Sequence, residues 1–307
     1  MLVLHGRDLR HLRRAGRLLT RRVRFRTPDG VVHDGHVVKD AEALCVESTQ
    51  GLRLPVADPA TLALEGATLL RPLDPPEVWC SGVTYERSRD ARIEESGSDV
   101  YARVYDADRP ELFLKDAACR RTVGPNDPIA IRSDATWNVP EPEIGLVLGE
   151  ALEIAGYVIG NDVSSRDIEG ANPLYLPQAK VYAGGCAIGP AILVTEATDP
   201  VFEIELRILD STGAQLFLGT ASTARMKRGF AELAEWLVRD NPVPPGSVLL
   251  TGTGLVPPDD FTLEPGQIVE IHVPGIGTLR NDVVLATELL LQRKAESARA
   301  NSAAQNP

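Results

Sequence analysis

The sequence has no apolar run long enough to cross a membrane, and its four cysteines lie far apart. A membrane helix needs about 20 consecutive apolar residues, so we expect no membrane partner. The cysteines form no C-x-x-C pair, which disfavours both a zinc site and a disulfide framework. A chain without a disulfide framework is typical of a reducing compartment, so we expect the protein in the cytoplasm.

Lysine is also scarce, because only five of the 32 basic residues are lysine. The 43 acidic residues outnumber the basic ones and give a net charge of −11. An acidic protein binds polyanions poorly, so no nucleic-acid partner is expected. The arginine-rich N-terminus is typical of a basic surface segment in an arginine-preferring sequence, although an organelle transit segment would be arginine-rich too. Because the protein as a whole is acidic, an anionic ligand must meet a local cluster of cations.

The 307 residues, 43% of them apolar, fit one large globular domain or a large and a small one. Alternating segments around "TPDG" predict a hairpin near the N-terminus. The proline-rich stretch at residues 71–79 predicts a linker. We therefore expect a small β-rich N-terminal domain at residues 1–72, a main domain at 73–293 and a frayed polar tail at 294–307.

Short apolar runs separated by glycine, proline and aspartate dominate the main domain and predict an α+β fold that is mainly β. One amphipathic helix is predicted in "TARMKRGFAELAEWLVRD", where Met226, Phe230, Leu233 and Leu237 recur at helical spacing. The stretch 85–108 is dense in charge and has little to bury. It predicts an exposed helix or a mobile loop.

Two glutamates stand two apart at the head of the apolar run "PEPEIGLVLG". Alternate residues of a strand point to the same face, so Glu141 and Glu143 would project together. Two half-buried carboxylates repel each other unless a cation lies between them, and Asp162, just past a later strand, offers a third carboxylate. Oxygen ligands favour Mg²⁺, Mn²⁺ or Ca²⁺. Spacing alone leaves open a solvated strand edge on which Asp162 caps a turn.

The segment that follows Asp162, "SSRDIEGANPLYLPQAKVYAGG", carries more polar function than a connector needs. Its lysine, Lys180, is a candidate for holding a carboxylate or a developing oxyanion beside a metal ion. A surface lysine is the alternative interpretation.

Several segments in a fixed order resemble the fumarylacetoacetate hydrolase superfamily over most of residues 77–285: "PEPEIGLVLG", "GYVIGNDVSSRD", the following lysine, "LLTGTG" and "GIGTLRNDV". The resemblance implies a β-roll of mixed sheets, often behind a smaller N-terminal domain. It implies a homodimer or homotetramer. It also implies that Glu141, Glu143 and Asp162 bind Mg²⁺, with Mn²⁺ or Ca²⁺ as substitutes.

The same resemblance assigns roles to residues outside the carboxylate cluster. The active-site lysine of the superfamily falls on Lys180, and Thr253 lies in the "TGT" turn beside the substrate. Glu111 in "RPELFLK" is a second acid–base candidate, for which a salt-bridged surface glutamate is the alternative. Further candidates for substrate contacts are Thr84, Tyr85, Glu169 and Gln178.

One motif of the superfamily is changed in this chain. Hydrolases and decarboxylases often carry N-Y-x-x-H in a lid, with a glutamate three residues later, and this His–Glu pair activates water. Here the stretch is "VTYERSRDAR", with Ser88 and Ala91 at the two positions. Neither is a useful general base, which disfavours water-driven C–C cleavage. We expect residues 85–108 to form the lid over bound substrate.

Other segments, among them "RPELFLK", "WNVPEPE" and "VPPDDFTL", resemble the sugar-acid branch of the superfamily, the 2-keto-3-deoxy-D-arabinonate dehydratases. This branch implies a hydro-lyase that takes a small anionic 2-keto acid. The pentonate would lose water through a metal-stabilised enolate and give 2,5-dioxopentanoate. The sequence leaves open a C–C bond hydrolase of the acylpyruvase or fumarylacetoacetate type, an oxaloacetate-type decarboxylase, and a non-catalytic ligand-binding homologue.

Overall fold

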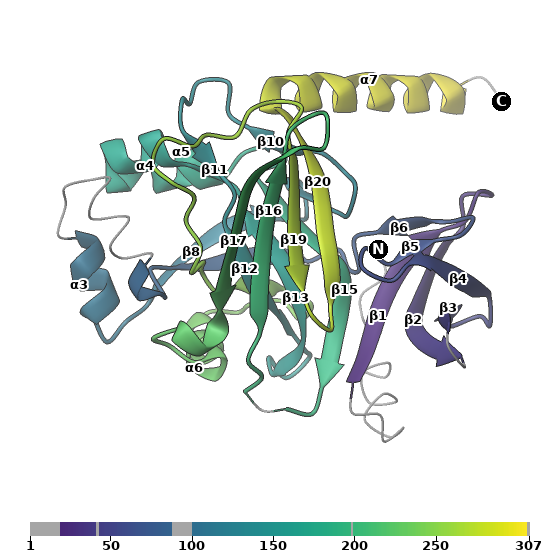
Figure 1. Ribbon diagram of the computed structural model, residues 1–307, viewed down its shortest axis with the longest axis horizontal. Helices are drawn as coiled ribbons and strands as arrows, with labels where there is room; N and C mark the ends of the chain where they lie inside the picture. Colours follow the sequence, from purple (N-terminus) through teal and green to yellow (C-terminus); the bar gives the residue numbers. More distant parts are fainter. Residues whose placement is uncertain (1–18, 41–42, 88–99, 198, 306–307) are drawn as a thin grey trace.

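The computed structural model describes residues 19–40, 43–87, 100–197 and 199–305. Its architecture is mainly β with mixed sheets, which confirms the expected fold class (Figure 1). The described strands form one sheet of thirteen strands, one of five and one of two. None of the helices in these ranges is both long and apolar enough to span a bilayer.

The large sheet runs through the whole molecule, in the strand order β5-β4-β3-β2-β1-β15-β13-β12-β18-β7-β8, with β6 on β1 and β9 on β15. Its strands are β1 (Leu19–Arg26), β2 (Val32–Asp40), β3 (Ala43–Ser48), β4 (Arg53–Asp58), β5 (Ala63–Leu64), β6 (Thr68–Leu70), β7 (Glu77–Gly82), β8 (Glu111–Ala117), β9 (Thr122–Val123), β12 (Pro142–Leu148), β13 (Ile154–Asp162), β15 (Cys186–Thr195) and β18 (Val248–Leu250).

The N-terminal strands are joined to the rest of the molecule by hydrogen bonds between β1 and β15. Strands β1 to β6 lie within residues 19–70, before the proline-rich stretch at which the sequence predicts a boundary. They have a small core of their own that includes Val23, Phe25 and Val46. The N-terminal region is therefore a separate β-rich layer in packing, but it shares one sheet with the remainder of the chain (Figure 1).

The main hydrophobic core lies between the large sheet and the five-stranded sheet. The latter has the order β10-β20-β19-β16-β17, with β10 (Ile129–Ile131), β16 (Glu203–Leu209), β17 (Gln215–Ser222), β19 (Ile268–Val273) and β20 (Gly277–Leu285). Ile144 and Leu146 of β12 face Leu206 and Ile271 of the smaller sheet in one buried cluster. Each such side chain stabilises the fold by about 1.5–3 kcal/mol, so the strands that carry the acidic residues are held firmly.

The predicted amphipathic helix is confirmed as α6 (Phe230–Val238), which buries Phe230, Leu233 and Leu237. Ahead of it, residues Thr223–Arg225 form the short helix η2 instead of a first turn. The C-terminal helix α7 (Ala286–Gln305) is attached through Ala286 and Leu289, and its later part extends from the body (Figure 1). The expected polar tail is therefore helical up to Gln305.

Small elements complete the fold beside the large sheet. The two-stranded sheet pairs β11 (Asn138–Val139) with β14 (Ser164–Ser165), and the short helices are α3 (Val100–Asp106), α4 (Arg166–Ala171), η1 (Pro173–Tyr175) and α5 (Leu176–Lys180). Helices α4 and α5 come directly after β13 and β14, so the chain segment that carries Lys180 returns to the edge at which β13 ends (Figure 1).

Candidate active site

Five neighbouring strands of the large sheet end or begin at one common edge. Strand β12 is antiparallel to both β13 and β18, β18 is parallel to β7, and β7 is antiparallel to β8. The starts of β12 and β8 therefore lie beside the ends of β13, β18 and β7. The residues placed there are Glu141, Glu143, Asp162, Gly252, Ser81 and Glu111.

The three predicted metal ligands form one buried cluster at this edge. The amide of Asp162 donates to the carbonyl of Glu141 at 3.0 Å, which sets the two residues side by side on adjacent strands. Glu143 follows two residues along β12. Each of the three carboxylates offers an oxygen within 4.8 Å of the others. Three buried oxygen ligands at this spacing fit a hard divalent cation such as Mg²⁺.

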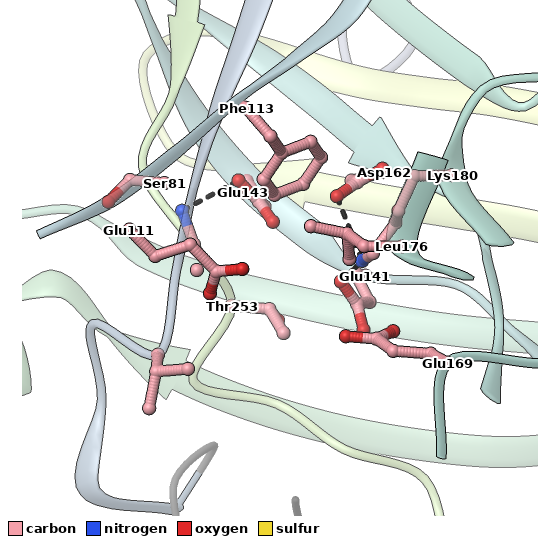
Figure 2. A pocket seen from close by; sticks show the side chains of 13 residues that line it. Ser81, Glu111, Phe113, Glu141, Glu143, Asp162, Glu169, Leu176, Lys180 and Thr253 are labelled. Carbon is pink, nitrogen blue, oxygen red and sulfur yellow. Dashed lines mark hydrogen bonds and ion pairs between the residues drawn. The ribbon is translucent and has the colours of Figure 1, made fainter. Parts of the chain in front are cut away.

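Three buried cations surround the carboxylates. Lys180 Nζ lies 2.7 Å from Glu141 Oε2 and 3.0 Å from Asp162 Oδ2 (Figure 2). On the far sides of the cluster, Arg166 Nη2 lies 3.0 Å from Glu141 Oε1, and Lys115 forms an ion pair with Asp162 Oδ1. Burying a charge is unfavourable unless it is paired. These ion pairs keep the cluster stable inside the protein.

Glu143 takes its hydrogen bond from the turn after β18. The amide of Gly252 donates to Glu143 Oε2 at 2.6 Å. Gly252 has a φ of +88°, and a Cβ at this position would lie 2.1 Å from the hydroxyl oxygen of Thr84. Glycine is therefore needed to aim this amide at Glu143. Burial, and after it the charges of Asp162 and Glu141, raise the pKa of Glu143 well above its usual range. A bound cation removes this penalty.

A pocket opens over the cluster. Figure 2 shows Glu111 and Glu169 reaching toward it from different elements, with Phe113 and Leu176 among its apolar side chains. Its lining residues are Ser81, Gly82, Val83, Glu111, Phe113, Glu141, Glu143, Asp162, Glu169, Leu176, Lys180, Gly252 and Thr253. The pocket thus combines a carboxylate cluster, a lysine and further carboxylates within reach of one small ligand.

The sequence-based candidates around the metal ligands fall into two groups. Glu111, Glu169, Lys180 and Thr253 line the pocket, as a ligand contact requires. The Thr253 hydroxyl also donates to the carbonyl of Leu255 at 3.1 Å, which holds the turn.

The remaining three candidates lie outside the pocket lining. Thr84 is buried behind the Gly252 turn, where its hydroxyl donates to the carbonyl of Thr251 at 2.7 Å. Tyr85 is buried beside the same turn, and burial raises the pKa of its phenol. Gln178 is exposed on α5. Their predicted substrate contacts stay predictions.

Sequence reasoning missed Lys115, Phe113 and Ser81. Glu111, Phe113 and Lys115 alternate along β8, so one face of this strand presents all three to the site. The period-two spacing in "ELFLK" was therefore a usable signal for Lys115. Ser81 is buried in the pocket wall, and its hydroxyl has no hydrogen-bond partner among the described residues. Nothing in the local sequence marks it out.

The predicted lid falls largely outside the described residues. Residues 88–99, which include Ser88 and Ala91, belong to the part that the structure does not describe. The described end of the segment, α3 and the residues after it, contacts the chain just before α6. Arg228 donates to the carbonyls of Ala107 and Asp108 there, the latter at 3.0 Å. The lid function stays a prediction.

The comparisons with known proteins define the class of the protein. The model of the C-terminal domain of fumarylacetoacetate (FAA) hydrolase matches residues 77–284, and the chain therefore belongs to the fumarylacetoacetate hydrolase family. This match covers every element at the common strand edge.

The names of individual relatives are more specific than the family description. The chain is 50% identical over 214 residues to a probable 2-keto-3-deoxyxylonate dehydratase of Haloferax volcanii, covering 69% of this chain and 73% of that protein. It is 45% identical over 217 residues to the 2-dehydro-3-deoxy-D-arabinonate dehydratase of Saccharolobus solfataricus, covering 69% and 72%. A solved structure of 2-keto-3-deoxy-D-arabinonate dehydratase complexed with magnesium and 2,5-dioxopentanoate has a TM-score of 0.73 and 37% identity, covering 86% of this chain and 98% of that one.

Proposed function

We propose that this protein is a Mg²⁺-dependent hydro-lyase that converts a 2-keto-3-deoxy pentonate, D-arabinonate or a close relative, to 2,5-dioxopentanoate. The observation that supports this proposal most directly is the buried Glu141–Glu143–Asp162 cluster, which Lys180 contacts from the pocket. The solved relative that is complexed with magnesium and 2,5-dioxopentanoate supports the same substrate class.

The carboxylate cluster and the lysine divide the chemical work. A divalent cation held by Glu141, Glu143 and Asp162 supplies a Lewis acid that polarises the oxygen of a 2-keto group and acidifies the neighbouring C3–H bonds. Lys180 lies beside the cluster and can stabilise negative charge on the keto oxygen or carry a proton. The mixed-charge cluster therefore suits proton abstraction next to a carbonyl.

Dehydration also needs groups that transfer protons to and from carbons C3 to C5 and the C4 hydroxyl of the substrate. A proton leaves C3 and the C4 hydroxyl leaves as water, after which a proton transfer from C5 to C3 gives the C5 enol and then the aldehyde. Glu111 faces the pocket from β8 and is our candidate for proton transfer. Glu169, on α4, lines the pocket and is our candidate acceptor of hydrogen bonds from substrate hydroxyls.

The pocket chemistry argues against the hydrolytic alternative. None of the described residues that line the pocket is a histidine, and Ser88 and Ala91 stand at the positions of the hydrolytic His–Glu pair. A water nucleophile would have to be activated without that base. Enolate formation needs only the cation, Lys180 and a proton acceptor.

Side-by-side turnover of two substrates tests the proposal. With Mg²⁺, the protein is expected to form the aldehyde from 2-keto-3-deoxy-D-arabinonate at least about a hundredfold faster than it releases pyruvate from an acylpyruvate, the usual scale for one missing acid–base partner. Aldehyde formation is followed by a dehydrogenase-coupled assay and pyruvate by lactate dehydrogenase. The Lys294→Met variant, changed at an exposed residue of α7, should give the same ratio of the two rates as the wild type. Efficient pyruvate release without aldehyde would contradict the proposal.

We also propose that the protein acts as a homo-oligomer, a dimer or a tetramer, in the cytoplasm. Leu216 and Leu218 are about half exposed on β17, an edge strand of the five-stranded sheet, and Leu290 and Leu291 are exposed on α7. Exposed apolar side chains on an edge strand support association with a second copy. The mass of the active species, measured by light scattering, is expected to be two or four times the 33.2 kDa of one chain. An active species of 33.2 kDa would contradict the proposed association.

A further inference from the structure

In each carboxylate of the metal-binding cluster, one oxygen lies against a cation or an amide from another element of the fold. Arg166 Nη2 donates to Glu141 Oε1 at 3.0 Å, and the Gly252 amide donates to Glu143 Oε2 at 2.6 Å. Lys115 Nζ forms an ion pair with Asp162 Oδ1, an oxygen that accepts no hydrogen bond among the described residues.

Lys115 is the most firmly held side chain of these donors. Its side chain is 0% exposed, and Nζ donates to the carbonyl of Val163 at 3.0 Å as well as pairing with Asp162. The ring of Tyr182 covers the ammonium group, with its centroid 5.7 Å from Nζ. Lys115 does not line the pocket. It therefore holds Asp162 from inside the protein.

The other oxygen of Asp162 has a different environment. Oδ2 lies 3.0 Å from Nζ of Lys180, which does line the pocket. The two oxygens of one carboxylate thus meet two lysines, one in the protein interior and one at the ligand side. Oδ2 is therefore the oxygen that lies beside the pocket-lining lysine.

We propose that Lys115 is a positioning residue that withholds Oδ1 of Asp162 and thereby makes the site prefer Mg²⁺ to Ca²⁺. The inference rests on the proposed function only in that both need a cation at the cluster. Ca²⁺ takes six to eight oxygens and often both oxygens of one carboxylate, whereas Mg²⁺ takes six at shorter distances. A carboxylate limited to one oxygen satisfies the smaller ion and leaves the larger ion short of ligands.

The choice of lysine fits this role. The chain has 27 arginines and only five lysines, yet two of the five contact Asp162. An arginine fork commonly engages both oxygens of a carboxylate, whereas an ammonium group is a point charge that can engage one. A lysine at position 115 therefore fixes Asp162 and leaves Oδ2 available.

Calorimetric titration of the metal-stripped full chain with Mg²⁺ and with Ca²⁺ tests the proposal. In Lys115→Met, the ratio of the Ca²⁺ to the Mg²⁺ dissociation constant is expected to fall at least about tenfold, the scale known for groups that orient metal ligands. The ratio in Lys294→Met, an exposed lysine on α7, should equal that of the wild type. A purely structural role would weaken both ions together and leave the ratio unchanged, and this result would overturn the proposal.

A crystal structure of the wild type with Mg²⁺ gives a second test that does not depend on the folding of a variant. Asp162 is expected to contact the ion through Oδ2 alone, with Lys115 still on Oδ1. Contact through both oxygens would overturn the proposal. Neither test contains substrate, so a failure to form aldehyde would count against the proposed reaction and not against the role of Lys115.

Discussion

Replacing Lys180 with alanine is expected to lower kcat by at least about a thousandfold, within the range for loss of a group that moves protons or stabilises the transition state. Lys180 is the only cationic side chain among the described residues that line the pocket. Its ammonium also lies between carboxylates that a metal ion must bind, so Mg²⁺ affinity should not fall when it is removed. Steady-state kinetics and a Mg²⁺ titration on the same preparation measure the two effects separately.

The control for this variant is Lys227→Ala. It removes a lysine whose Nζ contacts Asp106, on α3, at 3.3 Å and does not line the pocket. Because Asp106 belongs to the predicted lid, Lys294→Ala, at an exposed residue of α7, is the second control that leaves this segment untouched. Substantial turnover by Lys180→Ala would show that another group carries the proton. A loss of Mg²⁺ binding in Lys180→Ala would instead show that the lysine supports the metal site.

Replacing Glu143 with glutamine is expected to lower Mg²⁺ affinity at least about a hundredfold, because losing a ligand's charge should cost no less than losing a group that orients a ligand. Turnover should fall with it. The amide oxygen of glutamine can still accept from the Gly252 amide, so the geometry at this turn is retained while the negative charge is lost. Calorimetry measures the affinity, and excess EDTA followed by Mg²⁺ tests the metal requirement in the wild type.

The stability of the metal-free variant separates a ligand role from a structural one. Burial and two neighbouring carboxylates raise the pKa of Glu143, which means that its charged form is unfavourable in the folded state without a cation. Metal-free Glu143→Gln should therefore melt no lower than the metal-free wild type. A large drop in its melting temperature, or full activity of Glu143→Gln in excess EDTA, would show that Glu143 is not there to hold a metal ion.

The sequence predicted those parts of the site that depend on residues close to one another in the chain. The alternation of Glu141 and Glu143 required only that the run after them be a strand, and β12 is that strand. Asp162 was found because a carboxylate at a strand end is conspicuous. Lys180 was found because its segment has little to bury. The superfamily motifs then supplied the chemistry that spacing left open.

The remainder depended on contacts between distant parts of the chain. Lys115 meets Asp162 from a strand 47 positions earlier, and no local pattern indicates which carboxylate a lysine will reach. The Gly252 turn acts on Glu143 across 109 positions. Likewise, pairing of β1 with β15 joins the N-terminal strands to the large sheet, which composition could not foresee. Residues 294–296 of α7 are exposed, and the sequence after them is rich in alanine and polar residues, so this part of the helix resembled a tail.

The common strand edge has a consequence for how such a protein can be redesigned. The predicted metal ligands lie on, or directly before, the paired strands β12 and β13, whereas Glu111, Glu169 and Leu176 come from an edge strand and two short helices. Arg166, the first residue of α4, links the two sets because it pairs with Glu141. An exchange of residues 167–179, which keeps both Arg166 and Lys180, can therefore change which acid is accepted while the groups around the carboxylate cluster stay in place. Directed evolution toward a new substrate should concentrate its library there.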